Sequence, residues 1–234
     1  MVTLWLLFAC TDDTTPPTGD SGPADSGTTL GTTTDEPELG LGELSGDCGV
    51  LDDEWTSSEP FTLRNAVELA GWDEALLSDQ GTVVWEAGNL GGSSLESEVL
   101  AFEVLHACEG AALLKTEADI SYDDSGGKKT DLLVEIDGHT VGVSVTRAFH
   151  YPPDEPYTLA EAEDLLLDKL ADVALSADNA SDADAWSRSV LHVVAYDGQY
   201  GDQITAAWAG LDSGVKGDHG VVLTVTDGDD EAIY

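Results

Sequence analysis

Basic residues are scarce in this chain. It has 8 Lys+Arg against 47 Asp+Glu among 234 residues, which gives a formal net charge of -39 at pH 7. Proteins that bind nucleic acid place Lys and Arg against the phosphates, whereas the overall field of this chain repels a polyanion. Nucleic acid is therefore an unfavourable partner. A solubilising acidic surface is the simpler interpretation of the charge, and the sequence names no protein partner.

The common catalytic and zinc-binding patterns are also absent. The sequence contains no Cys-x-x-Cys, no nucleophile elbow and no Ser-His-Asp order, so it carries no signature of the usual serine hydrolases or zinc sites. The histidines lack the spacing of zinc ligands; they are His106, His139, His150, His192 and His219. The chain does have 41% hydrophobic residues and 6 Trp, enough to bury a core. Residues 47–234 are therefore expected to form a single acidic domain.

The N-terminus has a short apolar run. Leu4 to Ala9 is far below the roughly 20 residues that span a bilayer. The run ends in Leu7-Phe8-Ala9-Cys10, which resembles the lipobox of bacterial lipoproteins. The resemblance implies a signal peptide over residues 1–10 and a diacylated Cys10 as the mature N-terminus. Phe8 is bulkier than the lipobox pattern has, and no Lys or Arg precedes the run. The alternative is a frayed apolar N-terminus with a chance cysteine.

Residues 11–46 are rich in Thr, Gly, Asp, Ser and Pro and contain almost no large apolar side chain. Such a segment buries too little surface to offset its ordering entropy, which predicts a disordered tether. An apolar run, a cysteine and a long polar tether together form the layout of a surface lipoprotein. We therefore expect an exported protein of the cell envelope, held to the membrane by its lipid anchor and facing the periplasm or the cell exterior.

The chain has 3 Cys. If Cys10 carries lipid, Cys48 and Cys108 remain for the folded domain. An even pair in an oxidising compartment most often forms a disulfide, so we expect Cys48 and Cys108 to be linked. Two buried free thiols are the alternative.

From residue 61 onward, apolar periodicity and turn residues predict alternating helices and strands. Capping boxes at Ser93-x-x-Glu96 and Thr158-x-x-Glu161 mark two helix starts, and Asp137-Gly138 predicts a hairpin turn. The predicted helices are 61–71, 93–108, 158–176 and 202–211. The predicted strands are 82–86, 111–122, 130–136, 140–147, 189–196 and 221–226.

Over roughly residues 93–194, the element order and the single hairpin resemble the PD-(D/E)xK, or restriction-endonuclease-like, fold. The expected fold class is therefore α/β, with a mixed sheet in αβββαβ core order flanked by helices and preceded by the tether.

The resemblance implies a site built from an acid on the first helix, an acid on the second strand and an E-x-K on the third. The carboxylates would hold Mg²⁺ or Mn²⁺. By position, Glu98 is the helix acid and Asp131 the strand acid. The third strand departs from the pattern, because Ser144 and Thr146 stand where the acid and the lysine belong. Some members of the family carry the lysine on the following helix, which makes Lys169 the candidate here.

Glu98 is also unusual by its own helix geometry. At about 100° per residue it projects between Leu105 and Phe102, inside an apolar stripe, where a carboxylate costs free energy unless it is paired. The alternative is a residue at the edge of the helix that reaches water. Glu96 and Glu103 are expected on the polar face.

Two functions follow as expectations. The first is a lipid-anchored domain with a degenerate nuclease-like fold and a binding or structural role. The alternative is a metal-dependent phosphodiester hydrolase that uses Glu98, Asp131 and Lys169. Five of the eight bases cluster in or after the hairpin, and they form either a local cationic site or ordinary ion pairs; they are Lys128, Lys129, Arg147, Lys169 and Arg188.

Overall fold

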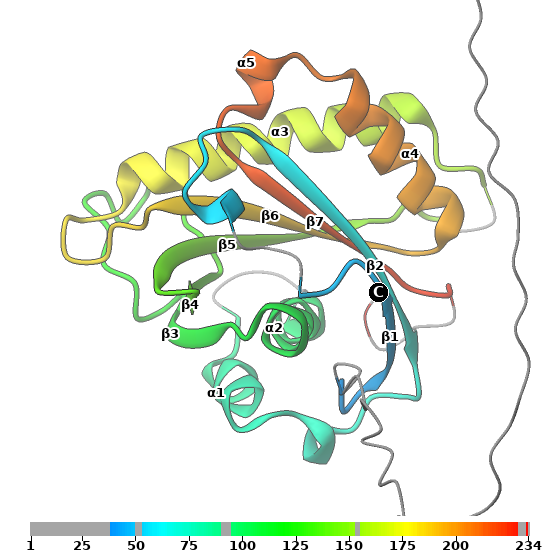
Figure 1. The fold of residues 1–234 in the computed structure, drawn as a ribbon, viewed down its shortest axis with the longest axis horizontal. Helices are drawn as coiled ribbons and strands as arrows, with labels where there is room; N and C mark the ends of the chain where they lie inside the picture. The colour runs from blue at the N-terminus through cyan, green and yellow to red at the C-terminus, as the bar shows by residue number, and fades with distance from the viewer. Residues whose placement is uncertain (1–37, 50–52, 90–94, 153–154, 229–232, 234) are drawn as a thin grey trace, which may run out of the picture. The chain divides into compact units, whose positions relative to one another are not determined.

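A mixed β-sheet runs through the centre of the fold (Figure 1). Its seven strands lie in the order β1-β2-β7-β6-β5-β4-β3. The four central strands β2, β7, β6 and β5 are parallel to one another. Strand β1 at one edge and strands β4 and β3 at the other extend the sheet through antiparallel pairs. The strands are β1 (Gly42–Gly46), β2 (Phe61–Leu69), β3 (Ala112–Thr116), β4 (Leu132–Ile136), β5 (His139–Ala148), β6 (Arg188–Ala195) and β7 (Gly220–Val225).

This computed structural model describes residues 38–49, 53–89, 95–152, 155–228 and 233. They belong to one compact unit, Asp35–Tyr234. Cys10, most of the expected tether and Ser93 of the first expected capping box lie outside the described residues. None of the helices in the described ranges is both long enough and apolar enough to cross a membrane.

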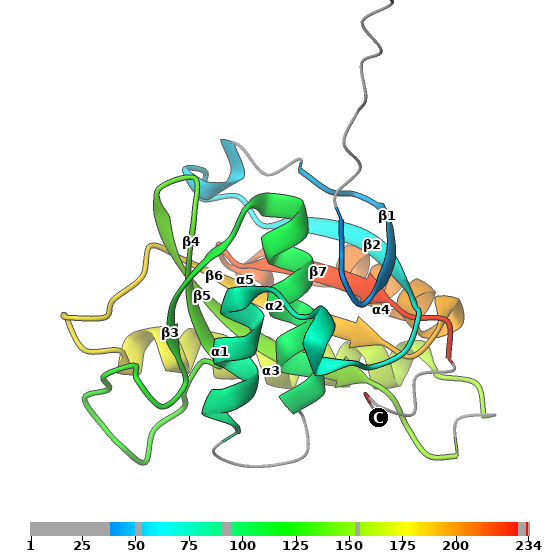
Figure 2. The same cartoon turned by 90° about the horizontal axis from the view of Figure 1, so that it is seen from below.

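Helices cover both faces of the sheet (Figures 1 and 2). The α-helices are α1 (Asp79–Ala87), α2 (Leu95–Glu109), α3 (Leu159–Asn179), α4 (Gly198–Gly210) and α5 (Ser213–Lys216), and two short 3-10 helices are η1 (Asp53–Trp55) and η2 (Glu74–Leu76). Helices α3, α4 and α5 lie on one face, and α1 and α2 lie on the other. Strands β6 and β7 are consequently buried along their whole length, as is usual for parallel strands covered on both faces.

The expected core order is confirmed. Elements α2, β3, β4, β5, α3 and β6 follow one another as αβββαβ within a mixed sheet. The capping box of α3 is present, with the Thr158 side chain accepting from the Glu161 N–H and the Glu161 side chain accepting from the Thr158 N–H. The expected first strand, 111–122, is shorter than predicted, since β3 ends at Thr116.

Two predicted elements are wrong. In place of the expected helix 61–71, residues 61–69 form strand β2, and the alternating burial of Leu63, Asn65 and Val67 shows the two-residue period of a strand. The β-branched run 82–86 belongs to helix α1 in place of a strand. The Ser78 side chain caps this helix by accepting from the Gly81 N–H, and the cap together with packing on α2 overrides the local strand propensity.

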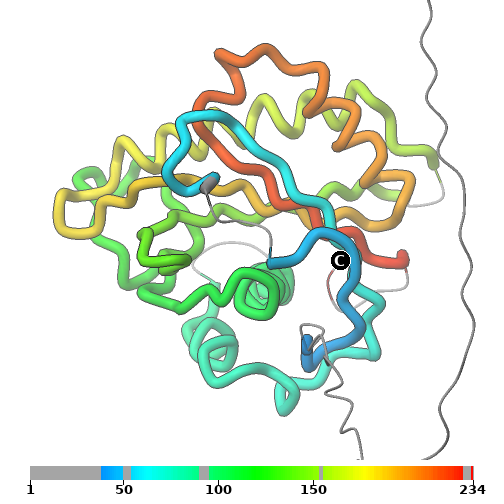
Figure 3. The backbone as a smooth tube through the Cα atoms, in the orientation of Figure 1, coloured from blue at the N-terminus to red at the C-terminus, as the bar shows by residue number. Residues whose placement is uncertain are grey.

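The end of the expected tether is folded. Strand β1 pairs antiparallel with β2, although it lies within residues 11–46. Leu39 and Leu41 are buried in one cluster with Val104 of α2 and Ile233 at the other end of the chain, so the two ends of the described chain meet beside α2 (Figure 3). Burial of these leucines draws the entry segment into the core, which composition alone did not indicate.

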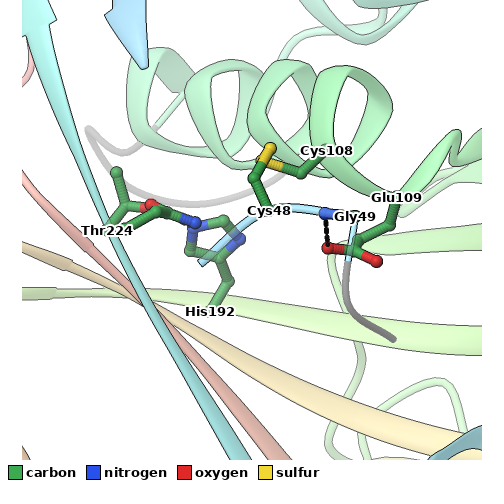
Figure 4. Close-up of a disulfide and its surroundings, with 7 residues drawn as sticks. Cys48, Gly49, Cys108, Glu109, His192 and Thr224 are labelled. Atoms are coloured by element: carbon green, nitrogen blue, oxygen red, sulfur yellow. Dashed lines mark hydrogen bonds between the residues drawn. A yellow bond between two sulfur atoms is a disulfide. The ribbon is translucent and has the colours of Figure 1, made fainter. Parts of the chain in front are cut away.

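The expected disulfide between Cys48 and Cys108 is confirmed (Figure 4). It joins the segment that follows β1 to the last turn of α2. His192 and Thr224 lie beneath it in the sheet, where the His192 Nε2 and Thr224 Oγ1 atoms are 2.7 Å apart. Thr224 in turn donates to the Asn65 Oδ1 at 2.7 Å. Burial lowers the pKa of His192 to about 3, so the ring is neutral and ties three strands together without a buried charge.

Reduction of this disulfide should lower the stability of the domain. The bridge closes a sequence separation of 60 residues, for which chain entropy gives about 4 kcal/mol of stabilisation. We expect a clear fall in melting temperature when reductant is added to the wild-type protein. Adding reductant to the double variant Cys48→Ser, Cys108→Ser should leave its melting temperature unchanged. Quantitative alkylation of both cysteines in native protein isolated without reductant would contradict the linkage.

Candidate functional site

Asp131 occupies the start of strand β4, at its junction with β5. Its N–H donates to the Val143 carbonyl at 3.0 Å, which continues the β4–β5 pairing by one residue and places Asp131 opposite Ser144. Its carboxylate accepts a hydrogen bond from the Val145 N–H at 2.6 Å. The acid is therefore held by the backbone of the neighbouring strand, at the position where the resemblance expects it.

Glu98 lies in the first turn of α2 and is 5% exposed. The expectation of a residue at the edge of the helix that reaches water is therefore wrong. The Glu98 Oε1 accepts a hydrogen bond from the Asn89 side-chain amide at 2.8 Å. In the first turn of α2, Leu95 and Glu96 are partly exposed, whereas Ser97 and Glu98 face the interior. A buried carboxylate must then find donors within the protein.

Glu98, Asp131 and Lys169 act on one another electrostatically. The pKa of Asp131 is raised from 3.8 to about 7, first by burial and then by the negative charge of Glu98. The hydrogen bond from Val145 and the positive charge of Lys169 act in the opposite direction and lower it. The charges of Glu98 and Lys169 are thus both felt at Asp131, and the assignment of the three residues to one site stays a prediction.

Glu117 is a fourth charged group in this neighbourhood, and sequence reasoning missed it. Its negative charge also raises the pKa of Asp131. Glu117 directly follows β3, and the β3–β4 register pairs Thr116 with Leu132, so the next residue comes opposite Asp131. An acid at the end of that strand was a signal in the sequence, but only the strand register shows which residue it faces.

The two motif departures have ordinary local roles. The Ser144 Oγ lies 3.1 Å from the Thr130 Oγ1, so its hydroxyl is engaged in a side-chain hydrogen bond. Thr146 is a half-buried residue of β5. Arg147, the arginine of this strand, donates from Nη1 to the carbonyl of Ile233 at 2.6 Å. The third strand therefore supplies neither a carboxylate nor a lysine.

The donor set does not fit a divalent metal centre of the expected kind. Within the described ranges, no three His, Cys, Asp or Glu side chains come together in a group that could hold a metal ion. Mg²⁺ and Mn²⁺ prefer several oxygen ligands, carboxylates foremost. Glu98 and Asp131 provide two, Glu117 does not complete a metal-holding group with them, and hydroxyls are poor replacements. We therefore derive no hydrolytic step through a metal.

The clustered bases form separate local contacts. Lys128 makes an ion pair with Asp172 of α3 at 2.8 Å, and the Lys129 ammonium lies over the ring of Tyr122. Arg188 is buried, and its guanidinium donates to the carbonyls of Ser57 and Glu59. Each of these three cations is thus used by its own neighbours, which favours the interpretation as ordinary structural contacts.

Comparison with known proteins adds little about function. No family model matches the chain, and no solved structure matches it. A curated protein of Dictyostelium discoideum, described as the AAC-rich mRNA clone AAC4 protein, is 39% identical over 124 residues. The matched part is 50% of this chain and 18% of that protein. Because the chain spans so small a share of that relative, the match assigns neither a family nor an activity.

Replacing Asp131 by Asn should stabilise the domain at neutral pH. Asn keeps an oxygen to accept the Val145 N–H and removes the repulsion with Glu98. In the unfolded chain Asp131 titrates near 3.8 and in the folded chain near 7. Between these values the folded state binds the extra proton, so this group lowers wild-type stability as pH rises. We expect Asp131→Asn to gain about 1–3 kcal/mol at pH 8 and almost nothing at pH 4.

Denaturant titration at the two pH values measures this difference. Glu135→Gln, which changes an exposed acid in the same strand, is the matched control and should leave stability unchanged at both pH values. A loss of stability for Asp131→Asn at pH 8 would show that the ionised carboxylate is needed by the fold.

Proposed function

We propose that this chain is a lipid-anchored exported protein whose domain carries a degenerate nuclease-like site and serves in binding or structure without catalysing hydrolysis. The observation that carries the proposal is that strand β5 has neither the acid nor the lysine that the resemblance expects there. At the position of the third acid, Ser144 shares a hydrogen bond with Thr130. The two remaining acids already accept hydrogen bonds from Val145 and Asn89. Such internally satisfied groups are typical of a structural role.

A metal-dependent phosphodiester hydrolase is the second candidate. It is favoured by the shared electrostatics of Glu98, Asp131 and Lys169, because a carboxyl pKa raised to about 7 beside another carboxylate is typical of functional sites. It is disfavoured by the missing third acid and by the net charge of -39, which opposes the approach of a polyanionic substrate.

Titration with Mn²⁺ and Mg²⁺ separates these two functions. A ligand that binds only the folded state raises its stability with the logarithm of ligand concentration. If the site is degenerate, we expect either metal to change the melting temperature of the wild type no more than it changes that of Asp131→Asn. We also expect no hydrolysis of single-stranded or duplex DNA beyond a metal-only blank.

The hydrolase would give the opposite results. Wild-type melting temperature would rise steeply with Mn²⁺, Asp131→Asn would no longer respond, and Glu98→Gln and Lys169→Ala would each abolish DNA hydrolysis. Observation of that set would overturn the degenerate assignment.

The proposal of a lipid anchor has its support in the order of apolar run, Cys10 and polar segment in the sequence. The Cys48–Cys108 disulfide supports export as well, because structural disulfides persist in oxidising compartments. Together they make the cell envelope the proposed location, with the domain facing the periplasm or the exterior.

Removing the acylated cysteine should release the protein from the membrane. In the native host, Cys10→Ala is expected to move the protein from the membrane fraction to the soluble fraction, since no acyl chain can then be attached. Mass spectrometry of the wild-type N-terminus should show the lipid on Cys10. Ser45→Ala is a suitable control that leaves the lipobox intact. A wild-type protein that is soluble and carries no lipid would refute the anchor.

A further inference from the structure

Helix α3 has an outward face on which leucines and acids alternate. Its opposite side packs against the sheet through residues such as Leu166 and Leu170. On the outward side, Leu167 is 42% exposed and Leu175 is 52% exposed, with the exposed Ala171 between them. At about 100° per residue these three positions follow one another along a single stripe. We call this stripe and its flanking acids the α3 outer face.

The flanking charges are all negative. The acids of the α3 outer face are Glu163, Asp164, Asp168 and Asp178, and all four are exposed. Ion pairs in the described residues reach Glu161 and Asp172 of this helix and none of those four. The acids therefore keep their charge facing solvent around an apolar stripe.

This arrangement costs the isolated helix stability. Asp164, Asp168 and Asp172 stand four residues apart in succession, and like charges at that spacing destabilise a helix. Asp178 adds a negative charge in the last turn, where no basic residue is present to offset the helix dipole. A bound cationic segment would relieve both penalties while covering the leucines.

Other occupants do not match this chemistry. Residues 1–37 of the same chain contain acids and no Lys or Arg, so they would add repulsion. A second copy brings a net charge of -39, and an anionic lipid surface is repelled in the same way. A partner with Lys or Arg on either side of an apolar stripe can cover the leucines and pair with the acids at the same time.

We propose that the α3 outer face is a docking surface for a cationic amphipathic helix of a partner protein. Leu167 and Leu175 are the apolar anchors, and the surrounding acids pair with Lys or Arg of the partner. The surface lies on the opposite side of α3 from its sheet-packing residues. It does not depend on whether the Glu98–Asp131 site binds a metal.

The test uses the full-length chain and a labelled synthetic helix of Leu and Lys at heptad spacing, with a scrambled peptide of the same composition. Fluorescence anisotropy should show binding of the patterned peptide and much weaker binding of the scrambled one. Leu167→Ser with Leu175→Ser should weaken binding roughly tenfold or more, since two half-exposed leucines lose their apolar contact. Asp164→Asn with Asp168→Asn should weaken binding and reduce its salt dependence.

Three control variants should bind like the wild type. Leu114→Ser changes a leucine that is 45% exposed on β3, Glu68→Gln changes an exposed acid on β2, and Asp131→Asn tests independence from the candidate metal site. Circular dichroism and melting curves of the leucine variants should match those of the wild type, because the replaced side chains are exposed.

Several outcomes would overturn the proposal. Equal binding of the scrambled peptide would show charge attraction without a helical surface, and unchanged binding by the leucine variants would place the contact elsewhere. Dimerisation of the full-length chain that the leucine variants abolish would make the occupant a second copy. Adsorption of the Cys10→Ala chain to phosphatidylcholine vesicles through the same leucines would make it a lipid surface.

Discussion

The middle of helix α2 is buried on every side, and this one constraint shapes both the fold and the candidate site. Residues from Ser97 to Leu105 are all buried, including two carboxylates. Each carboxylate must be met by donors from another element. Glu103 accepts from the backbone and side chain of Ser78, which holds α1 against α2. The same carboxylate lies so close to Gly81 that a Cβ there would collide with it. Glu103 is therefore a structural tie between helices, although its spacing placed it on a polar face.

The second buried carboxylate of α2, Glu98, acts electrostatically on Asp131 beside the junction of β4 and β5. There burial and then the negative charge of Glu98 raise the pKa of Asp131, while the Val145 hydrogen bond and the charge of Lys169 lower it. Two acids beside a single lysine, with a hydroxyl at the third position, form an arrangement that lacks part of a hydrolytic centre. Backbone and amide donors replace the missing cation: the Val145 N–H holds Asp131, and Asn89 holds Glu98. These hydrogen bonds support the proposal of a degenerate site.

Acidity has different consequences inside the domain and on its surface. Inside, each acid must be neutralised by hydrogen bonds or a raised pKa, because water is excluded. On the surface, screening by water and salt allows acids to accumulate, as along the outer side of α3. There the acids surround exposed Leu167 and Leu175, and this combination is the basis of the proposed docking surface. The net charge of -39 thus favours cationic partners over polyanions.

The sequence by itself determined the αβββαβ order, the capping box at Thr158 and the Cys48–Cys108 pair, because periodicity, caps and cysteine parity are local or countable features. It also placed Glu98 and Asp131 by position. It failed for β2 and α1, where pairing with β1 and β7 and packing on α2 outweigh local propensity. Only the tertiary structure decided that Glu98 is buried, that Glu117 lies near Asp131, and that Leu167 is left exposed. Those facts depend on strand register and on which helix faces are covered, and both are set by contacts between residues far apart in the chain.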